Sequence, residues 1–290
     1  MFIVTSGTGH VGSAVAAALL DAGEPVTIVS RNPAKAKALK DRGATIASVD
    51  VHDVDGLRQV FRSGRRAFLL NPPADVASDT DVEERRTVTC LLEALDGSGL
   101  EKVVAESTMG ARPGDRIGDL SVLYGFEQGL RRQAIRADII RAGYYFSNWD
   151  AMAEPASRDG AITSMLPADL KLPMVAPEDI GRIAARFLRE PPSGHDIHFV
   201  EGPERYSPRD VAAAFGVALG RDVDVKEVPR ANWEDQFKAL GFSPAAADAY
   251  ARMTAATVDN PDYPDDPIRG SITLQAYIGN LARPRPGIPS

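Results

Sequence analysis

Three glycines near the start of the chain, Gly7, Gly9 and Gly12, follow the spacing G-x-G-x-x-G. Glycines at this spacing let the backbone turn tightly and approach a pyrophosphate, whose charge then rests on the N-terminus of the next helix. The alternative is a packing turn that binds nothing. An apolar run at 2–5 and a helix-forming run at 11–20 flank the glycines, which favours a dinucleotide site. The predicted contacts here are Ser6, Gly7, Thr8, Gly9, His10, Val11 and Gly12.

The end of the second strand-like run indicates which dinucleotide to expect. An NAD site needs an acidic residue there, whereas this chain has Arg31, with Lys35 and Lys37 close behind. A guanidinium can hold a 2′-phosphate through paired, charge-assisted hydrogen bonds. Alternatively, Arg31 is a solvated loop charge and the lysines belong to a helix surface. We predict that Arg31 and Lys35 bind the cofactor, and that NADP(H) is preferred over NAD(H).

Polar or turn-forming residues end three further strand-like runs, the third, fourth and fifth. Ligands of open parallel sheets lie at the carboxyl ends of the strands, so these residues are placed to contact the cofactor. Each of them is also a plausible turn residue. The predicted cofactor contacts in these positions are Asp50, Val51, Asn71, Pro72, Pro73 and Ser107.

An aromatic segment, 144–149, follows the sixth strand-like run, where a substrate would meet the nicotinamide. Aromatic faces can stack on a planar acceptor such as a quinone. The alternative is that these rings pack the C-terminal part of the chain against the sheet. The predicted substrate contacts are Met109, Tyr124, Tyr144, Tyr145, Phe146, Asn148 and Trp149.

Alternating strand-like and helix-like segments must position these residues. Strand-like runs occur at 2–5, 26–30, 46–49, 67–70, 103–106 and 139–141, and helical patterns at 11–22, 33–42, 53–62, 81–97 and 121–135. Such alternation gives a parallel sheet with helices on both faces. We therefore predict an α/β fold with a Rossmann-type, doubly wound parallel sheet.

The character of the chain changes after residue 143. We expect the aromatic segment to be a loop that leads into irregular sequence up to Pro173. Further helices are expected at 177–189, 207–219, 232–240, 244–258 and 273–280, strands at 195–200 and 224–228, and a loop at 260–267. The predicted division is a nucleotide-binding domain over 1–142, to which 176–202 returns, and a smaller, mostly helical substrate lobe over 143–175 and 203–290.

Composition limits which kinds of molecule the protein can bind and where it is expected to function. The 290 residues carry a net charge of −7, which argues against a general nucleic-acid or membrane-surface binder. Cys90 is the only cysteine, and we interpret it as core packing. The first strand begins at residue 2 and no apolar run approaches membrane-spanning length, so a cytoplasmic protein is expected. We also expect a monomer or a homodimer. No metal is expected, because His195 and His198 would lie on opposite faces of a strand.

The order of motifs along the chain resembles one known group. "TSGTGHVG" resembles the "TGATGxxG" opening of atypical short-chain dehydrogenases, and specifically of the NmrA-like family. The likeness continues through "VSRNPAKAKAL", "DVHDVDGLRQVF", "AFLLNPP", "GLEKVVAEST", "RAGYYFSNW", "LKLPMVAPEDIGRIAARFL" and "GPERYSPRDVAAAFGVALGRDV". One departure is that Ser6 and Gly7 stand where the family usually has Gly-Ala. We expect the turn to change while the helix N-terminus remains.

The resemblance implies an NADP-binding Rossmann fold, in either a reductase or a redox sensor. Typical short-chain dehydrogenases use a serine and a Tyr-x-x-x-Lys pair, in which the tyrosine acts as an acid. Here Leu123 stands where the family's usual lysine would precede Glu127, and Gln128 lies four residues after Tyr124. The pair is absent. The predicted catalytic residues are Tyr124, Tyr144 and Ser107.

The favoured hypothesis is NADPH-dependent reduction of a small conjugated acceptor, quinone- or enone-like, because such hydride transfer needs mainly proximity and orientation. The alternative is a non-catalytic NADP(H) sensor that acts through a protein partner, with the acidic loop Asp259–Asp266 as one candidate surface.

Overall fold

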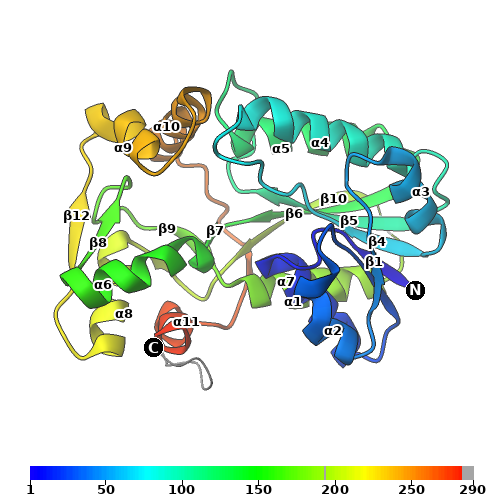
Figure 1. Ribbon diagram of the computed structural model, residues 1–290, viewed down its shortest axis with the longest axis horizontal. Coiled ribbons are helices and arrows are strands. Elements are labelled where there is room, and N and C mark those ends of the chain that lie inside the picture. Colours follow the sequence, from blue (N-terminus) through cyan, green and yellow to red (C-terminus); the bar gives the residue numbers. More distant parts are fainter. Residues whose placement is uncertain (193, 283–290) are drawn as a thin grey trace.

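The computed structural model describes residues 1–192 and 194–282, and its centre is an eight-stranded sheet (Figure 1). The strand order is β13-β10-β6-β5-β4-β1-β2-β3, and every neighbouring pair is parallel. The strands are β1 (Phe2–Val4), β2 (Val26–Val29), β3 (Thr45–Ala47), β4 (Arg66–Leu69), β5 (Lys102–Thr108), β6 (Arg136–Ala142), β10 (His195–Glu201) and β13 (Ile268–Arg269). The predicted Rossmann-type sheet is confirmed.

Helices cover both faces of this sheet (Figure 1). On one face lie α1 (His10–Asp21) and α7 (Pro177–Arg189), and on the other lie α3 (Val54–Arg62), α4 (Thr80–Leu95) and α5 (Asp119–Arg131). Successive side chains of each strand alternate between these faces, so Val104 packs with α1 and α7 while Val103 packs with the other three helices. Burial on both faces explains the nearly continuous apolar runs of the strands.

One predicted helix, 33–42, is divided in the structure. A 3₁₀ turn, η1 (Pro33–Ala36), precedes the short helix α2 (Lys37–Asp41). The Asn32 side chain accepts a hydrogen bond from the Ala34 amide, so it caps the 3₁₀ turn at the point where the sequence predicted a single helix start.

The remaining elements form a second part of the molecule (Figure 1). They are β7 (Tyr144–Tyr145), η2 (Phe146–Met152), α6 (Ala153–Asp159), β8 (Ala161–Ser164), β9 (Leu172–Val175), β11 (Arg205–Tyr206), α8 (Pro208–Leu219), β12 (Asp224–Glu227), η3 (Arg230–Asn232), α9 (Trp233–Ala239), α10 (Pro244–Asp259) and α11 (Leu274–Leu281). Two small sheets, β11-β9-β7 and β12-β8, tie these elements together over an apolar core of their own. The predicted substrate lobe covers these elements, and its residues 283–290 lie outside the described part of the chain.

The expectation of irregular structure between the aromatic segment and Pro173 was wrong. This segment contains η2, α6 and β8, and the expected aromatic loop begins with the strand β7. The helix α6 has no side-chain cap at its start, and β8 pairs only with β12, about sixty residues later in the chain. Tertiary pairing, which local sequence patterns do not carry, determines these elements.

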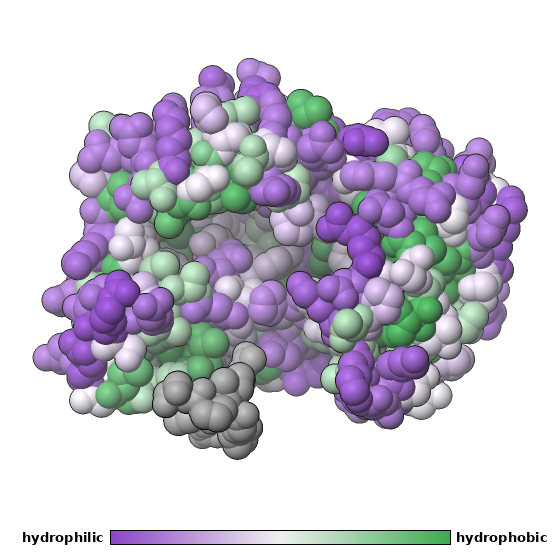
Figure 2. Space-filling model, in the orientation of Figure 1, coloured by the Kyte–Doolittle hydropathy of each residue, from purple (hydrophilic) through white to green (hydrophobic). Residues whose placement is uncertain are grey.

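The surface is hollowed between the two parts, as Figure 2 shows. Within residues 1–192 and 194–282, no helix combines the length and hydrophobicity that crossing a membrane would need.

Candidate functional site

The glycine turn leads from β1 directly into α1 and leaves the start of that helix open. Gly9 occupies the N-cap position, no side chain caps the helix, and the first turn holds no acidic residue. The first amides of a helix have no partner within the helix, so they are free to bind an anion. The residues present therefore fit a pyrophosphate.

The turn is closely packed around two of its glycines. A Cβ atom at Gly12 would lie 2.3 Å from the carbonyl oxygen of Ser6, and one at Gly7 would lie 2.2 Å from the Ile28 side chain. Ser6 itself has a φ of 50°, in the left-handed region that favours glycine. The displaced glycine therefore changes the turn as expected: a serine takes the left-handed conformation, and the helix N-terminus is kept.

The loops after β2 and β3 flank this turn on one side. The hydroxyl groups of Thr8 and Ser30 lie 3.2 Å apart, which places the loop after β2 against the glycine turn. The Arg31 side chain is 73% exposed, and its guanidinium lies 4.0 Å from the Asp50 carboxylate. Lys35 is also exposed, and Val51 is half-buried. An exposed guanidinium held only by a long ion pair is free to bind a phosphate.

Two buried polar atoms lie without hydrogen-bond partners at the ends of β4 and β5. They are Oδ1 of Asn71 and Oε2 of Glu106, each unpartnered within the described residues. The two strands are neighbours, with Leu69 opposite Ala105, so these atoms belong to the same edge of the sheet. Buried polar groups are normally satisfied, so these two atoms at the ligand-binding edge fit a polar group of a ligand. Pro72 and Pro73, both half-buried, extend this edge.

Ser107 lies on β5 but points away from Glu106, toward α5. Its hydroxyl donates a 2.6 Å hydrogen bond to Oε1 of Glu127, and Arg141 of β6 binds both oxygens of that carboxylate at 2.8 and 2.7 Å. Ser107 and Glu127 are each 1% exposed. The group therefore forms a buried, satisfied network in which the hydroxyl of Ser107 is already engaged.

The aromatic segment contains one exposed ring, that of Tyr144, and two buried rings, those of Phe146 and Trp149. Tyr144 is 37% exposed and its ring centre lies 6.0 Å from that of Trp149, which is almost fully buried. Phe146, predicted to contact substrate, is instead fully buried, with its ring 5.6 Å from Tyr206 and 5.5 Å from Tyr277. The packing alternative therefore holds for Phe146. Desolvation of the phenol group raises the pKa of Tyr144 to about 12, and a hydrogen bond with the exposed Asn148 opposes this shift.

Tyr145 points in a different direction from Tyr144 and reaches the end of β5. Its hydroxyl donates a hydrogen bond to Oε1 of Glu106, which is 3% exposed. Burial raises the pKa of Glu106 to about 8, and it also raises the pKa of Tyr145 well above its usual value. Neither Glu106 nor its contact with Tyr145 was predicted, because Glu106 was taken as the last residue of an apolar strand.

The segment after α10, expected to be a solvated loop, packs over the end of β5. Met109 shares a small pocket with residues 257 and 260–263. The guanidinium of Arg112 donates to the carbonyl oxygens of Asn260, at 3.1 Å, and Ala256. Met109 is 9% exposed, so this loop covers it.

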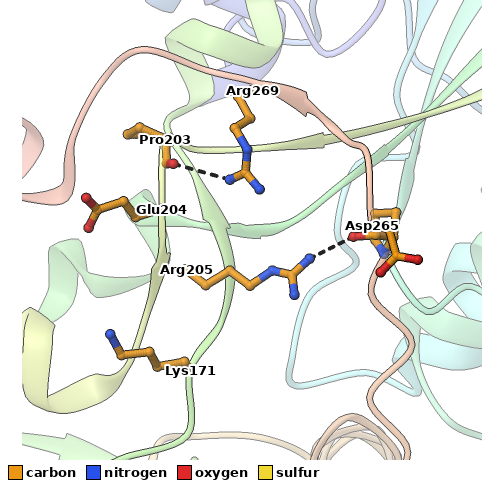
Figure 3. A pocket seen from close by; sticks show the side chains of 7 residues that line it. Lys171, Pro203, Glu204, Arg205, Asp265 and Arg269 are labelled. Carbon is orange, nitrogen blue, oxygen red and sulfur yellow. Dashed lines mark hydrogen bonds between the residues drawn. The ribbon is translucent and has the colours of Figure 1, made fainter.

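A second pocket, of about 540 Å³, lies at the ends of β10 and β13 (Figure 3). Figure 3 shows the guanidinium of Arg205 directed toward the segment that carries Asp265, and that of Arg269 directed toward Pro203. Both guanidinium groups also lie within 3.2 Å of the fully buried carboxylate of Glu201. These cations are already engaged, so they join strand ends rather than offer a site for an anion.

The sequence model of the NmrA-like family matches residues 1–260. The chain belongs to the NmrA-like family. Curated relatives are an NAD(P)H azoreductase of Xenophilus azovorans, 24% identical over 91% of this chain and 88% of the relative, and quinone oxidoreductase 2 of Escherichia coli K12, 25% identical over 87% and 86%. These relatives agree with the expectation of an NAD(P)H-dependent oxidoreductase.

A solved structure has the same fold. The NADPH-dependent quinone oxidoreductase of Escherichia coli in complex with NADPH superposes with a TM-score of 0.78 at 21% identity, over 97% of this chain and 99% of the other. At this identity the likeness shows the fold alone.

The sequence predicted that this NmrA-like protein lacks a Tyr-x-x-x-Lys pair, and the structure shows what surrounds those positions. Leu123, at the position of the usual lysine, packs against the apolar cluster beneath α5. Tyr124 beside it is half-buried. The cation nearest to the Ser107 hydroxyl network is Arg141, which the sequence indicated only as the end of a strand. Within residues 1–192 and 194–282, no group of three or more His, Cys, Asp or Glu side chains could hold a metal ion.

Proposed function

We propose that this protein is an NADPH-dependent oxidoreductase that reduces a small conjugated acceptor, quinone-like, enone-like or azo-like. One observation carries the proposal: the carboxyl edge of the sheet brings together an uncapped helix N-terminus and two buried polar atoms without partners. The names of the curated relatives, an azoreductase and a quinone oxidoreductase, support the same reaction class.

The cofactor would be held by residues of the glycine turn and of the adjacent strand ends. The amides of His10, Val11 and Gly12 would bind the pyrophosphate, because the Gly9 amide already donates to the Ser6 carbonyl oxygen at 3.0 Å. Arg31 with Lys35 would bind a 2′-phosphate. Asn71 Oδ1 would accept a hydrogen bond from the reactive half of the dinucleotide. NADPH supplies a hydride when bound, so the chain itself has to orient the acceptor and deliver a proton.

The acceptor would lie between this edge and the C-terminal part of the molecule. The exposed ring of Tyr144 offers a face for a planar molecule. A conjugated acceptor is reduced mainly through proximity and orientation, so the absence of a Tyr-x-x-x-Lys pair is compatible with this reaction. We propose that the active protein is a monomer or a homodimer.

Purified protein mixed with NADPH and a panel of quinones, enones and azo dyes tests the proposal. We expect loss of the NADPH absorbance that depends on both protein and acceptor. Binding of NADPH is measured in parallel by fluorescence, because binding without turnover of any acceptor would contradict the proposal.

The buried network of Ser107, Glu127 and Arg141 favours one second candidate, a non-catalytic NADP(H) sensor. The serine hydroxyl is occupied and the usual lysine is absent, so the family's ordinary acid is missing. A protein partner would then be required. Binding without turnover in the same assay would support this function, and co-purification of a partner dependent on NADPH would test it further.

A further inference from the structure

The pair formed by Glu106 and Tyr145 lies where a reducing site needs a proton donor. Glu106 is on the face of the sheet opposite to Ser107, because neighbouring residues of a strand alternate. Tyr145 packs against the apolar cluster that includes Val11 of α1, at the start of the helix behind the glycine turn. The pair therefore lies on the same face as the dinucleotide-binding turn, at the carboxyl ends of the strands.

The carboxyl group of Glu106 is only partly satisfied. Oε1 accepts the hydrogen bond from the Tyr145 hydroxyl, whereas Oε2 is buried without a partner in the part of the chain that the structure describes. Burying a carboxylate in this way costs far more free energy than burying a protonated carboxyl. The raised pKa of Glu106, about 8, has the same cause, so the carboxyl carries a proton at neutral pH.

The charged groups around the pair oppose ionisation. Asp119, at the start of α5, raises the pKa of both Glu106 and Tyr145 through its charge. Behind it, Glu84 of α4 is hydrogen-bonded to Asp119, and its own pKa is raised to about 8 by burial. Tyr250 of α10 lies beside these two carboxyls, and burial first and then their charges raise its pKa. The groups that act on the pair are thus acids, so the pair holds its protons rather than releasing them to a nearby base.

We propose that Tyr145 donates the proton that completes reduction of the acceptor, and that Glu106 replaces this proton. The inference rests on the proposed function. The acceptor gains two electrons as a hydride from NADPH, which is oxidised to NADP⁺. The Tyr145 O–H bond breaks as its proton passes to the acceptor's oxygen or nitrogen. The Glu106 O–H bond breaks as that proton passes to the Tyr145 oxygen, which leaves a carboxylate that solvent reprotonates after product release.

Four proteins are compared for NADPH oxidation with menadione and with methyl red across a range of pH: the wild type, Tyr145→Phe, Glu106→Gln and Tyr277→Phe. The last is the matched control, because the Tyr277 hydroxyl also donates to a carboxylate, Asp150, at 3.0 Å, but within the C-terminal part of the molecule. NADPH binding and thermal unfolding of each variant show whether it is folded.

We expect Tyr145→Phe to lower kcat on the order of 100-fold, the lower range of general acid catalysis, with NADPH affinity unchanged. In the wild type, kcat is full below the pKa of Glu106 and falls as the pH rises through about 8, because Glu106 must be protonated to supply Tyr145. Glu106→Gln should lower kcat and abolish that fall. Tyr277→Phe should behave as the wild type.

A folded Tyr145→Phe protein with wild-type kcat would overturn the inference and leave the proposed function intact. A wild type that binds NADPH but reduces neither acceptor would instead overturn both. Should either variant fail to fold, infrared difference spectra above and below the expected pKa are recorded for the Glu84→Gln/Asp119→Asn protein, because burial also raises the pKa of Glu84 and of Asp119. Absence of a protonated buried carboxyl at neutral pH in that protein overturns the inference, and its presence supports it.

Discussion

The buried ion pair between Glu127 and Arg141 gives the sharpest test of how this site is supported. Replacing Glu127 by Gln keeps the shape of the side chain but removes its charge. Glu127 is 1% exposed and Arg141 is 13% exposed in its side chain, so the guanidinium is left without a counter-charge in a poorly solvated place. Breaking a buried pair by removing one partner costs about 3–5 kcal/mol of unfolding free energy.

This cost translates into a shift of the unfolding temperature. Unfolding entropy is about 2.1 cal/mol/K per residue, so the 290 residues give roughly 0.6 kcal/mol/K. The expected fall in Tm for Glu127→Gln is therefore about 5–8 °C. The measurement is calorimetry of the wild type and the variant in the same buffer.

A matched exposed pair provides the control. Arg209 binds both oxygens of Asp169 at 2.6 and 3.0 Å, the same forked geometry, but the two side chains are 62% and 77% exposed. Because solvent screens this pair, Asp169→Asn should leave Tm unchanged within error. The triple variant Ser107→Ala/Glu127→Leu/Arg141→Met should recover most of the loss, since well-packed apolar residues often replace a buried pair without cost and no buried hydroxyl is left without its acceptor. Equal shifts for Glu127→Gln and Asp169→Asn would refute the reasoning.

Three further predictions follow from the cofactor edge and its surroundings. Arg31→Ala should weaken NADP⁺ binding roughly tenfold or more by titration calorimetry, with little effect on NAD⁺, because a charge-assisted hydrogen bond is lost; equal losses would contradict the assignment. Gly12→Ala should abolish NADPH binding, since its Cβ would meet the Ser6 backbone, whereas Gly279→Ala, with open space around it, should bind normally in the same fluorescence titration. A hydrogen bond from Arg116 lowers the pKa of Asp79, so this pair stabilises the fold at pH values above the ordinary aspartate pKa. The stabilisation is lost as the pH falls from the ordinary pKa to the lowered one. In Asp79→Asn, the free energy of unfolding should therefore depend less on pH over this interval, which acid unfolding measures.

Local signals predicted the elements that carry their own start and stop residues. The helix α7 begins with Pro177 at its first position, where the missing amide costs nothing. The helix α8 begins at a capping box between Ser207 and Asp210, and it ends at Gly220 in the left-handed conformation. The helix α7 has the predicted bounds, and α8 begins one residue later than the predicted range, because Ser207 is its cap. The determining contacts lie within a few residues.

In the candidate site, the sequence predicted local structure only where it follows from one segment. The glycine turn was found because strand, turn and helix are contiguous. The contact between Tyr145 and Glu106 was not, since it joins residues 39 apart on two strands, and the sequence named Tyr124 and Tyr144 as proton donors instead. The sequence did contain one signal for these contacts: Glu106 and Arg141 are charged residues at the ends of apolar strands, where they need buried partners.

The order in which the chain is made matters for its nucleotide-binding sheet. The helix α7 packs against α1 on one face, and β10 pairs with β6 along six residues, yet both follow β6 in the sequence by more than thirty residues. A nascent chain that ends near residue 142 exposes the apolar face of α1 and an unpaired edge of β6, which is a surface prone to aggregation. The N-terminal half therefore cannot complete its fold on the ribosome until the segment through Glu201 has emerged, and a protein cut at residue 142 should require a chaperone to remain in solution.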